Sequence, residues 1–303
     1  MSLVTVTVPA STANLGPGFD CLSLALARYN ELELEVGGDG VQVEIEGEGA
    51  DQLQCDGSNL FVQAVFSLFE ELRIPPPGLR IHAVSRIPVG LGLGSSAAAI
   101  VAGLAAANAV LGGRLPRERL LALAYRLEGH ADNVAAALYG GLNMVGTGPE
   151  GVLSRQVPLP DLRVALAVPV LDVPTKTMRK VLPKEVPLHD AVYNLGRTAL
   201  TVEALRQGDY DLLSWSMKDR LHQPYRKALI PGYDVAMQAA RDAGAAAVVL
   251  SGAGPSLVAF SPSNHEAIAQ AMAEAFRAEG MQASTLVLPV DRGGVQTRPK
   301  GVH

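Results

Sequence analysis

The stretch from Pro88 to Ala98, PVGLGLGSSAA, has the composition of a loop that binds an anion. Glycines alternate with apolar residues, and Ser95 and Ser96 then lead into an alanine-rich run. Glycine accepts positive φ and lets a backbone approach a ligand closely, while a serine at a helix start can cap free N–H groups. Backbone donors at the positive end of a helix dipole suit a phosphate group. The alternative is a strand-to-helix turn whose small residues serve packing.

A second polar group lies between two apolar helical stretches and comprises Glu128, His130, Asp132 and Asn133. Its density at a helix junction favours burial beside a cleft. The competing explanation is that Asp132 or Asn133 caps a helix where the chain reverses. A lone histidine would favour a structural role. His130 is interpreted as a residue of a substrate site because carboxylates lie beside it in the sequence.

Two further glycine-containing stretches, ASTANLGPGFD at residues 10–20 and SGAGPS at 251–256, are predicted to be loops because glycine and proline interrupt regular elements. Asn14 and Asp20 supply oxygen acceptors in the first of them, although both residue types are also common in turns. SGAGPS has the alternative explanation of a tight connection between two strands.

The elements that must position these residues follow from hydrophobic periodicity. In the first half, alternation predicts strands near 4–8, 32–36, 41–45 and 79–83, with the second and third paired as a hairpin through the glycines at 37–40. Helices are predicted over 60–72, 95–110 and 117–127, and the pattern resumes at HADNVAAAL before a short strand at 142–145.

The second half predicts strands at 163–168, 246–250, 257–260 and 283–288, with helices near 176–181, 188–206, 210–220, 233–243 and 264–278. With the extra helices set aside, this order is βαββαβ, as in ferredoxin-like domains. A change of periodicity across 146–160 predicts two domains, residues 1–155 and 156–303. The polar tail after Pro289 is expected to be loose.

Composition narrows the function. The chain has 303 residues, 48% of them hydrophobic, and a net charge of −5 with no basic run, which argues against nucleic-acid and membrane-surface partners and favours small molecules. Cys21 and Cys55 are too few for a disulfide framework and lack a zinc-like spacing. The amino terminus reads as a strand, and the apolar run at 97–111 is too short to span a bilayer. A cytoplasmic protein is therefore expected.

The common nucleotide-binding signatures do not fit the glycine loop. No lysine follows the glycines as in a P-loop, the spacing is not GxGxxG, and the kinase HRD and DFG triplets are missing from the sequence. A different nucleotide fold is needed.

The three loops together carry a family resemblance. PxxxGLGSSAA at 88–98, VPASTANLGPGFD at 8–20 and SGAGPS at 251–256 resemble three ordered motifs of the GHMP kinases, which anchor essentially the full chain. Within that family, the homoserine kinase branch is similar at Ser11 to Asp20, Glu128 to Ala135, Thr175 to Arg179 and Pro224 to Pro231. Some members insert residues between the glutamate and the histidine, which are nearly adjacent here.

This resemblance implies an α+β fold with an N-terminal ribosomal-protein-like domain that binds ATP and a ferredoxin-like C-terminal domain. It implies that Ser96 and Glu128 hold Mg²⁺ and that Asn59 lies beside the adenine. The cofactor-binding residues that it implies are Asn59, Pro88, Gly90, Leu91, Gly92, Leu93, Gly94, Ser95 and Ser96. Phosphoryl transfer needs these parts, namely a metal ion, donors on the phosphates and an oriented hydroxyl.

For the acceptor, the resemblance implies transfer of the γ-phosphoryl group of ATP to the side-chain hydroxyl of L-homoserine, with Asp132, Glu128 and Ser96 as catalytic residues. Arginine's planar fork suits a carboxylate, whereas most arginines are solvated at a surface. The implied substrate-binding residues are Asn14, Asp20, His130, Asp132, Thr175, Arg179, Arg226 and Gly254. Another small-molecule kinase of the family and a non-catalytic ligand sensor are the alternatives, and a homodimer is compatible with the sequence.

Overall fold

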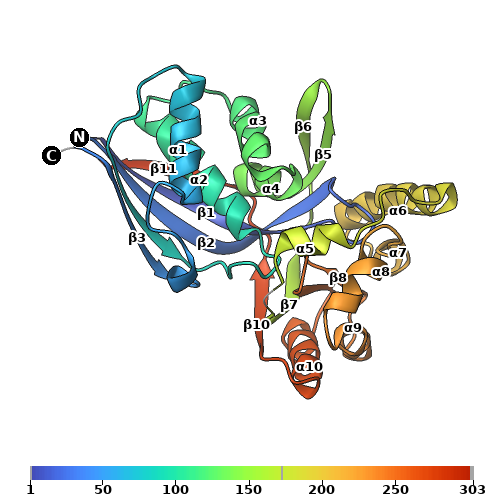
Figure 1. The fold of residues 1–303 in the computed structure, drawn as a ribbon. Coiled ribbons are helices and arrows are strands. Elements are labelled where there is room, and N and C mark those ends of the chain that lie inside the picture. Colours follow the sequence, from blue (N-terminus) through green and yellow to red (C-terminus); the bar gives the residue numbers. More distant parts are fainter. Residues whose placement is uncertain (1, 172, 301–303) are drawn as a thin grey trace.

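The computed structural model describes residues 2–171 and 173–300, which form two α+β units that pack side by side (Figure 1). The first contains a seven-stranded sheet with the order β11-β1-β2-β4-β3, in which β5 also pairs with β2 and β6 pairs with β5. Its strands are β1 (Ser2–Ala13), β2 (Leu22–Val36), β3 (Val41–Gly47), β4 (Leu79–Ser85), β5 (Leu142–Gly148), β6 (Gly151–Val157) and β11 (Gln296–Lys300).

Four helices cover one face of this sheet in Figure 1: α1 (Leu60–Glu71), α2 (Ser95–Val110), α3 (Arg117–Glu128) and α4 (Asp132–Tyr139). A short 3-10 turn, η1 (Ala50–Gln52), precedes them. The alanine-rich α2 is buried on nearly all sides, as expected for a helix without a polar face. A Cβ at its Gly103 would lie 2.6 Å from the Phe61 carbonyl oxygen, so α1 and α2 pack at close backbone distance. This packing fixes where α2 begins.

The second unit contains an antiparallel sheet with the order β10-β7-β9-β8. Its elements are β7 (Arg163–Pro169), β8 (Ala247–Leu250), β9 (Leu257–Phe260), β10 (Ala283–Pro289), α9 (Tyr233–Asp242) and α10 (His265–Ala278). Ala165 and Ala167 of β7 pack in the core with α9 and α10, while Val164 and Leu166 join the core of the first unit. The sheet is therefore buried on both faces, and the predicted ferredoxin-like order is confirmed.

The segment between β7 and α9 carries the additional helices α5 (Thr175–Lys180), α6 (Leu188–Gln207), α7 (Tyr210–Ser216), α8 (Gln223–Arg226) and the 3-10 turn η2 (Lys227–Leu229). In Figure 1, α5 lies near the centre of the molecule and α6 extends away from it. Among the described residues, no helix combines the length and apolar character needed to cross a membrane.

The predicted hairpin between 32–36 and 41–45 is wrong. Both edges of β2 are occupied in this region, one by β1 and the other by β4, and β3 pairs in parallel with β4. The burial patterns explain the order, because β4 alternates buried residues that suit the sheet interior, whereas β3 has only half-buried and exposed residues. Strand alternation alone does not distinguish these two arrangements.

Two segments expected to be irregular are strands. Residues 10–13 extend β1 beyond a shift of register between Pro9 and Ala10, so the loop begins at Asn14. The expected loose tail instead returns to the first unit, where residues 296–300 pair with β1. The first sheet thus contains the chain's C-terminal strand as well as β6, and the division at 155/156 stays a prediction.

Candidate active site

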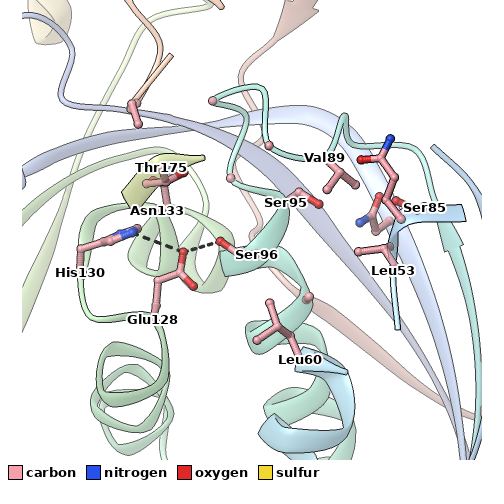
Figure 2. Close-up of a pocket in the computed structure, with 18 of the residues that line it drawn as sticks. Leu53, Leu60, Ser85, Val89, Ser95, Ser96, Glu128, His130, Asn133 and Thr175 are labelled. Atoms are coloured by element: carbon pink, nitrogen blue, oxygen red, sulfur yellow. Dashed lines mark hydrogen bonds and ion pairs between the residues drawn. The ribbon is translucent and has the colours of Figure 1, made fainter. Parts of the chain in front are cut away.

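A cavity of about 530 Å³ opens where the first unit meets the α5 and α8 segments and the loop between β8 and β9. Its walls bring together residues from all three glycine loops. Figure 2 shows the cavity with Glu128, His130 and Thr175 on one side and Leu53, Ser85 and Val89 on the other.

The central loop carries positive φ at Gly90, Gly92 and Gly94, with values of 72°, 82° and 71°. Only glycine adopts these angles without strain. The predicted serine cap is wrong: Gly94 is the N-cap of α2, and no side chain caps it there. Because all three glycines line the cavity with Ser95 and Ser96, the first turn of α2 presents uncapped N–H groups at the cavity, which suits a phosphate.

A chain of polar contacts runs from this helix into the cavity. The Ser96 hydroxyl donates to Glu128 Oε1 at 2.5 Å, and His130 Nε2 lies 3.5 Å from the same oxygen. His130 Nδ1 lies 3.3 Å from Asp132 Oδ1. Figure 2 shows Ser96, Glu128 and His130 converging. Although Glu128 and His130 are nearly adjacent in the sequence, their side chains therefore still meet at the same oxygen.

Burial shapes the protonation of this cluster. Desolvation raises the pKa of Glu128 above that of an ordinary glutamate, although His130 and the Ser96 hydroxyl counteract it. Burial by itself would lower the pKa of His130, but the hydrogen bond to Asp132 and the charges of Asp132 and Glu128 outweigh it and raise that pKa. The imidazole thus favours its cationic form between two carboxylates.

Asp132 is held firmly in place. Its side chain is 3% exposed, and Oδ1 accepts the backbone N–H of Asn133 at 2.8 Å. The Ser23 hydroxyl donates to the Asp132 carbonyl at 2.6 Å, and Asn133 Nδ2 donates to Ser11 Oγ at 2.9 Å. The helix-capping alternative is wrong, because Ala131 is the N-cap of α4 without a side-chain cap, and the Asp132 carboxylate lines the cavity.

Two cationic side chains line the same cavity. Arg179 forms a two-pronged ion pair with Asp20, at 3.0 and 2.7 Å. Arg226 is 1% exposed, and among the described residues no carboxylate forms an ion pair with it. Burial and the charge of Arg179 lower the pKa of Arg226 to about 10. Neither arginine is the solvated surface residue that is common in proteins, and Arg226 is a buried cation that faces a cavity.

The loop between β8 and β9 joins the other two loops. Ser251 Oγ contacts the Gly92 carbonyl at 2.7 Å and Thr12 Oγ1 at 2.8 Å, and Ser256 Oγ donates to the Leu91 carbonyl at 2.5 Å. The Gly252 carbonyl accepts from Asn14 Nδ2 at 2.7 Å. SGAGPS is therefore more than a connection, because its hydroxyls and carbonyls fix the central loop against the second unit.

The remaining wall mixes apolar side chains, including Leu53, Leu60 and Val89, with polar ones such as Gln52, Gln54 and Ser85. Asn59 also lines it, but its amide is engaged internally: Oδ1 accepts the Phe61 N–H at 2.8 Å as the cap of α1, and Nδ2 donates to the Gln54 carbonyl. Apolar side chains with a few polar groups beside a phosphate-binding helix suit a planar base.

The structure gathers most of the residues predicted from the sequence. Those that line the cavity are Asn14, Asp20, Asn59, Gly90, Gly92, Gly94, Ser95, Ser96, Glu128, His130, Asp132, Thr175, Arg179 and Arg226. Pro88, Leu91, Leu93 and Gly254 do not line it; Leu93 is fully buried, and the Leu91 carbonyl holds Ser256.

Sequence reasoning missed Ser11, Ser23 and His222, which hold site residues in place. Ser11 lies inside a stretch already singled out, so its position there was a usable signal. Ser23 and His222 lie outside every motif. Ser23 contacts Asp132 and His222 contacts Gly16, and in each pair the two residues are more than 100 positions apart in the sequence. His222 also precedes a short helix, α8, that the periodicity does not predict.

Comparisons with known proteins agree with this architecture. The model of the GHMP kinases N terminal domain matches residues 59–141, and that of the GHMP kinases C terminal matches 201–278. The homoserine kinase of Carboxydothermus hydrogenoformans is 41% identical, with 97% of this chain and 96% of that protein covered. That of Moorella thermoacetica is 43% identical, covering 96% and 98%.

Among solved structures, the homoserine kinase from Cytophaga hutchinsonii superimposes with a TM-score of 0.89 at 34% identity, covering 98% of this chain and 97% of that one. Both family models and these full-length relatives match a chain whose three glycine loops meet at one cavity. The chain belongs to the GHMP kinase family.

Proposed function

We propose that this protein is an ATP-dependent homoserine kinase, which transfers the γ-phosphoryl group of ATP to the side-chain hydroxyl of L-homoserine. The observation that carries the proposal is one cavity that brings together a phosphate-binding helix start, a carboxylate cluster and two arginines near Asp20. The full-length similarity to homoserine kinases supports the choice of acceptor.

The nucleotide would lie with its phosphates against the first turn of α2 and its base beside the apolar side chains of Leu53, Leu60 and Val89. Backbone N–H groups on the loop neutralise charge that builds up on the transferring group. Serine hydroxyls of the β8–β9 loop hold the glycine loop before α2 in place, so this phosphate-binding loop needs little reorganisation during the reaction.

The amino acid would be bound by both of its charged ends. Arg226 and Arg179 offer guanidinium forks to the carboxylate, with Thr175 beside them, while Asp20 and Asn14 offer oxygens to the ammonium group. This orientation directs the side-chain hydroxyl toward Asp132 and His130. Asp132 accepts a hydrogen bond from the hydroxyl and aligns its oxygen with the γ-phosphorus, which is the positioning that phosphoryl transfer requires.

The residues also fit a magnesium ion. Ser96 Oγ and Glu128 Oε1 are two hard oxygen donors 2.5 Å apart at the phosphate loop, the kind of partial ligand set that Mg²⁺ accepts when phosphates and water complete it. Ser96 and Glu128 would hold the ion, which would neutralise phosphate charge when bound. Within the described part of the chain, no three His, Cys, Asp or Glu side chains gather as a separate cation site.

Glu128→Gln tests this assignment. We expect the Mg²⁺ concentration at half-maximal rate to rise by about 10-fold or more, because the neutral amide is a weaker ligand than a carboxylate. The measurement is a magnesium titration of the initial rate at saturating ATP. The matched control is Glu203→Gln, which removes an exposed carboxylate whose partners within the described residues are Arg206 and Gln207 on α6. An unchanged magnesium dependence in Glu128→Gln would refute the metal role.

The acceptor is tested with a panel of hydroxyl compounds at fixed ATP and Mg²⁺, with products identified by mass. Homoserine is expected to give the highest kcat/KM, with threonine, mevalonate and shikimate well below it. Turnover of mevalonate or shikimate without turnover of homoserine would overturn the proposal and favour another small-molecule kinase. We also propose a cytoplasmic location, since ATP is a cytoplasmic substrate and both Cys21 and Cys55 are free thiols.

A further inference from the structure

The guanidinium of Arg226 is held by acceptors that carry no charge. Nε donates to the Met178 carbonyl at 3.2 Å, and Nη1 lies 3.2 Å from both the Gly252 carbonyl and His222 Nδ1. The two backbone carbonyls are placed by helix α5 and by the loop between β8 and β9, so His222 is the one side chain among these three partners. A substitution at His222 can therefore change the support of Arg226 without disturbing the backbone contacts directly.

The contacts fix the tautomer of His222. An arginine nitrogen can only donate, so Nδ1 must accept and the ring proton resides on Nε2. Nε2 then donates to the Gly16 carbonyl at 2.8 Å, with Asp219 Oδ2 at 3.5 Å. His222 is fully buried, and this burial lowers its pKa, which keeps the ring in the neutral form that these two bonds need.

The ring is itself held on two sides. Asp219 accepts the backbone N–H groups of His222 at 3.0 Å and of Gln223 at 2.7 Å, which fixes the start of α8. The Phe19 ring stacks on the imidazole with centroids 5.2 Å apart and an interplanar angle of 25°. Phe19 also lies under the guanidinium of Arg226, at 5.3 Å. His222 is thus a rigid link between the loop at 14–20 and Arg226.

We propose that His222 is a positioning residue for the acceptor: one ring nitrogen holds the Gly16 carbonyl while the other holds Arg226 in the geometry that receives the substrate carboxylate. This rests on the proposed function, because it assigns Arg226 to the amino-acid end of the acceptor. Within the described residues, no hydrogen bond, ion pair or ring contact joins His222 to the loop at 88–98 or to Asn59, so we expect the loss of the link to affect the acceptor and not ATP.

Three substitutions distinguish the contributions of the two ring nitrogens of His222. His222→Phe keeps a stacked ring and removes both bonds, His222→Asn retains an acceptor near the position of Nδ1, and His222→Gln retains a donor near that of Nε2. We expect His222→Phe to raise the KM for homoserine by about 10-fold or more, since small displacements of a binding group are costly, with the KM for ATP within about 2-fold. His222→Asn should recover most of the loss, whereas His222→Gln should not.

A double-mutant cycle with Arg226→Met distinguishes positioning from general structural support. In the Arg226→Met background, His222→Asn and His222→Gln should no longer differ in KM for homoserine. The matched control is Thr198→Val. This substitution removes a hydrogen bond of 2.9 Å to the Pro17 carbonyl, which belongs to the same loop at 14–20 as Gly16. Within the described residues, Thr198 has no hydrogen bond to Arg179 or Arg226. We expect it to change the KM for homoserine by less than about 2-fold.

Parallel rises in the KM values for ATP and homoserine, an equal effect of Thr198→Val, or a difference between the Asn and Gln variants that persists without Arg226 would each overturn the proposal. If His222→Phe does not fold, the Asn and Gln variants still decide it. If the wild-type protein does not phosphorylate homoserine, that result would instead contradict the proposed function. The ratios of KM between the variants and the wild type do not test that function.

Discussion

Asp132→Asn is expected to lower kcat for phosphorylation of homoserine by about 100-fold or more, the scale on which a positioned proton acceptor contributes. Asparagine has the same shape and keeps an oxygen for the Asn133 N–H, so the start of α4 should remain intact. What disappears is the negative charge that accepts the hydroxyl proton or its hydrogen bond. The KM for ATP should change far less than kcat, because Asp132 lies at the acceptor side of the cluster.

The measurement is steady-state kinetics with homoserine and ATP varied in turn, together with the melting temperature. Asp161→Asn serves as the control, since Asp161 is fully exposed and, in the part of the chain that the structure describes, forms an ion pair with Arg292 alone. A kcat within about 3-fold of the wild-type value at unchanged melting temperature would contradict the role of Asp132 in the reaction.

Arg226→Met is expected to lower kcat/KM for homoserine by about 100-fold, because the substrate carboxylate loses a charge-assisted, desolvated partner. Methionine fills much of the volume of the arginine stem. It also removes a buried cation that has no carboxylate partner within the described residues, so the free energy of unfolding should be unchanged or higher. Loss of activity with retained stability is the signature of a binding residue.

Aminopropanol, which is homoserine without its carboxylate, makes this prediction specific. Wild-type protein should use it poorly, and Arg226→Met should use it as well as the wild type does. Arg226→Lys keeps the charge without the planar fork, so its kcat/KM for homoserine should lie between those of the wild-type protein and Arg226→Met. If Arg226→Met lowered the rates with homoserine and aminopropanol by the same factor, Arg226 would not be the carboxylate partner.

Local chemistry accounts for what could be predicted from the sequence. The glycines at 90, 92 and 94 required positive φ, and Asn59 preceded an apolar helical pattern, so both the central loop and the cap of α1 could be predicted from neighbouring residues alone. The βαββαβ order followed from the sequence of elements. Family resemblance, and no spacing rule, connected Arg179 and Arg226 to the same site.

What could not be predicted depends on contacts between distant segments. The placement of β4 between β2 and β3 is decided by burial within a sheet, and the return of residues 296–300 to β1 joins the two ends of the chain. His222 was overlooked for the same reason, since its partner Gly16 lies 206 residues away in the sequence and its partner Arg226 belongs to the short helix α8. The central glycine loop is likewise complete only with Ser251 and Ser256 behind it.

The most direct test is to incubate the protein with ATP, Mg²⁺ and L-homoserine and follow adenine nucleotides and phosphorus-containing products together by chromatography and phosphorus NMR. The predicted result is one ADP formed per molecule of a phosphomonoester on the side-chain oxygen of homoserine, with about 100-fold less of that product from Asp132→Asn over the same interval. ADP accompanied by inorganic phosphate instead, or binding of both substrates without any phosphohomoserine, would contradict the assignment of this cavity as a homoserine kinase site.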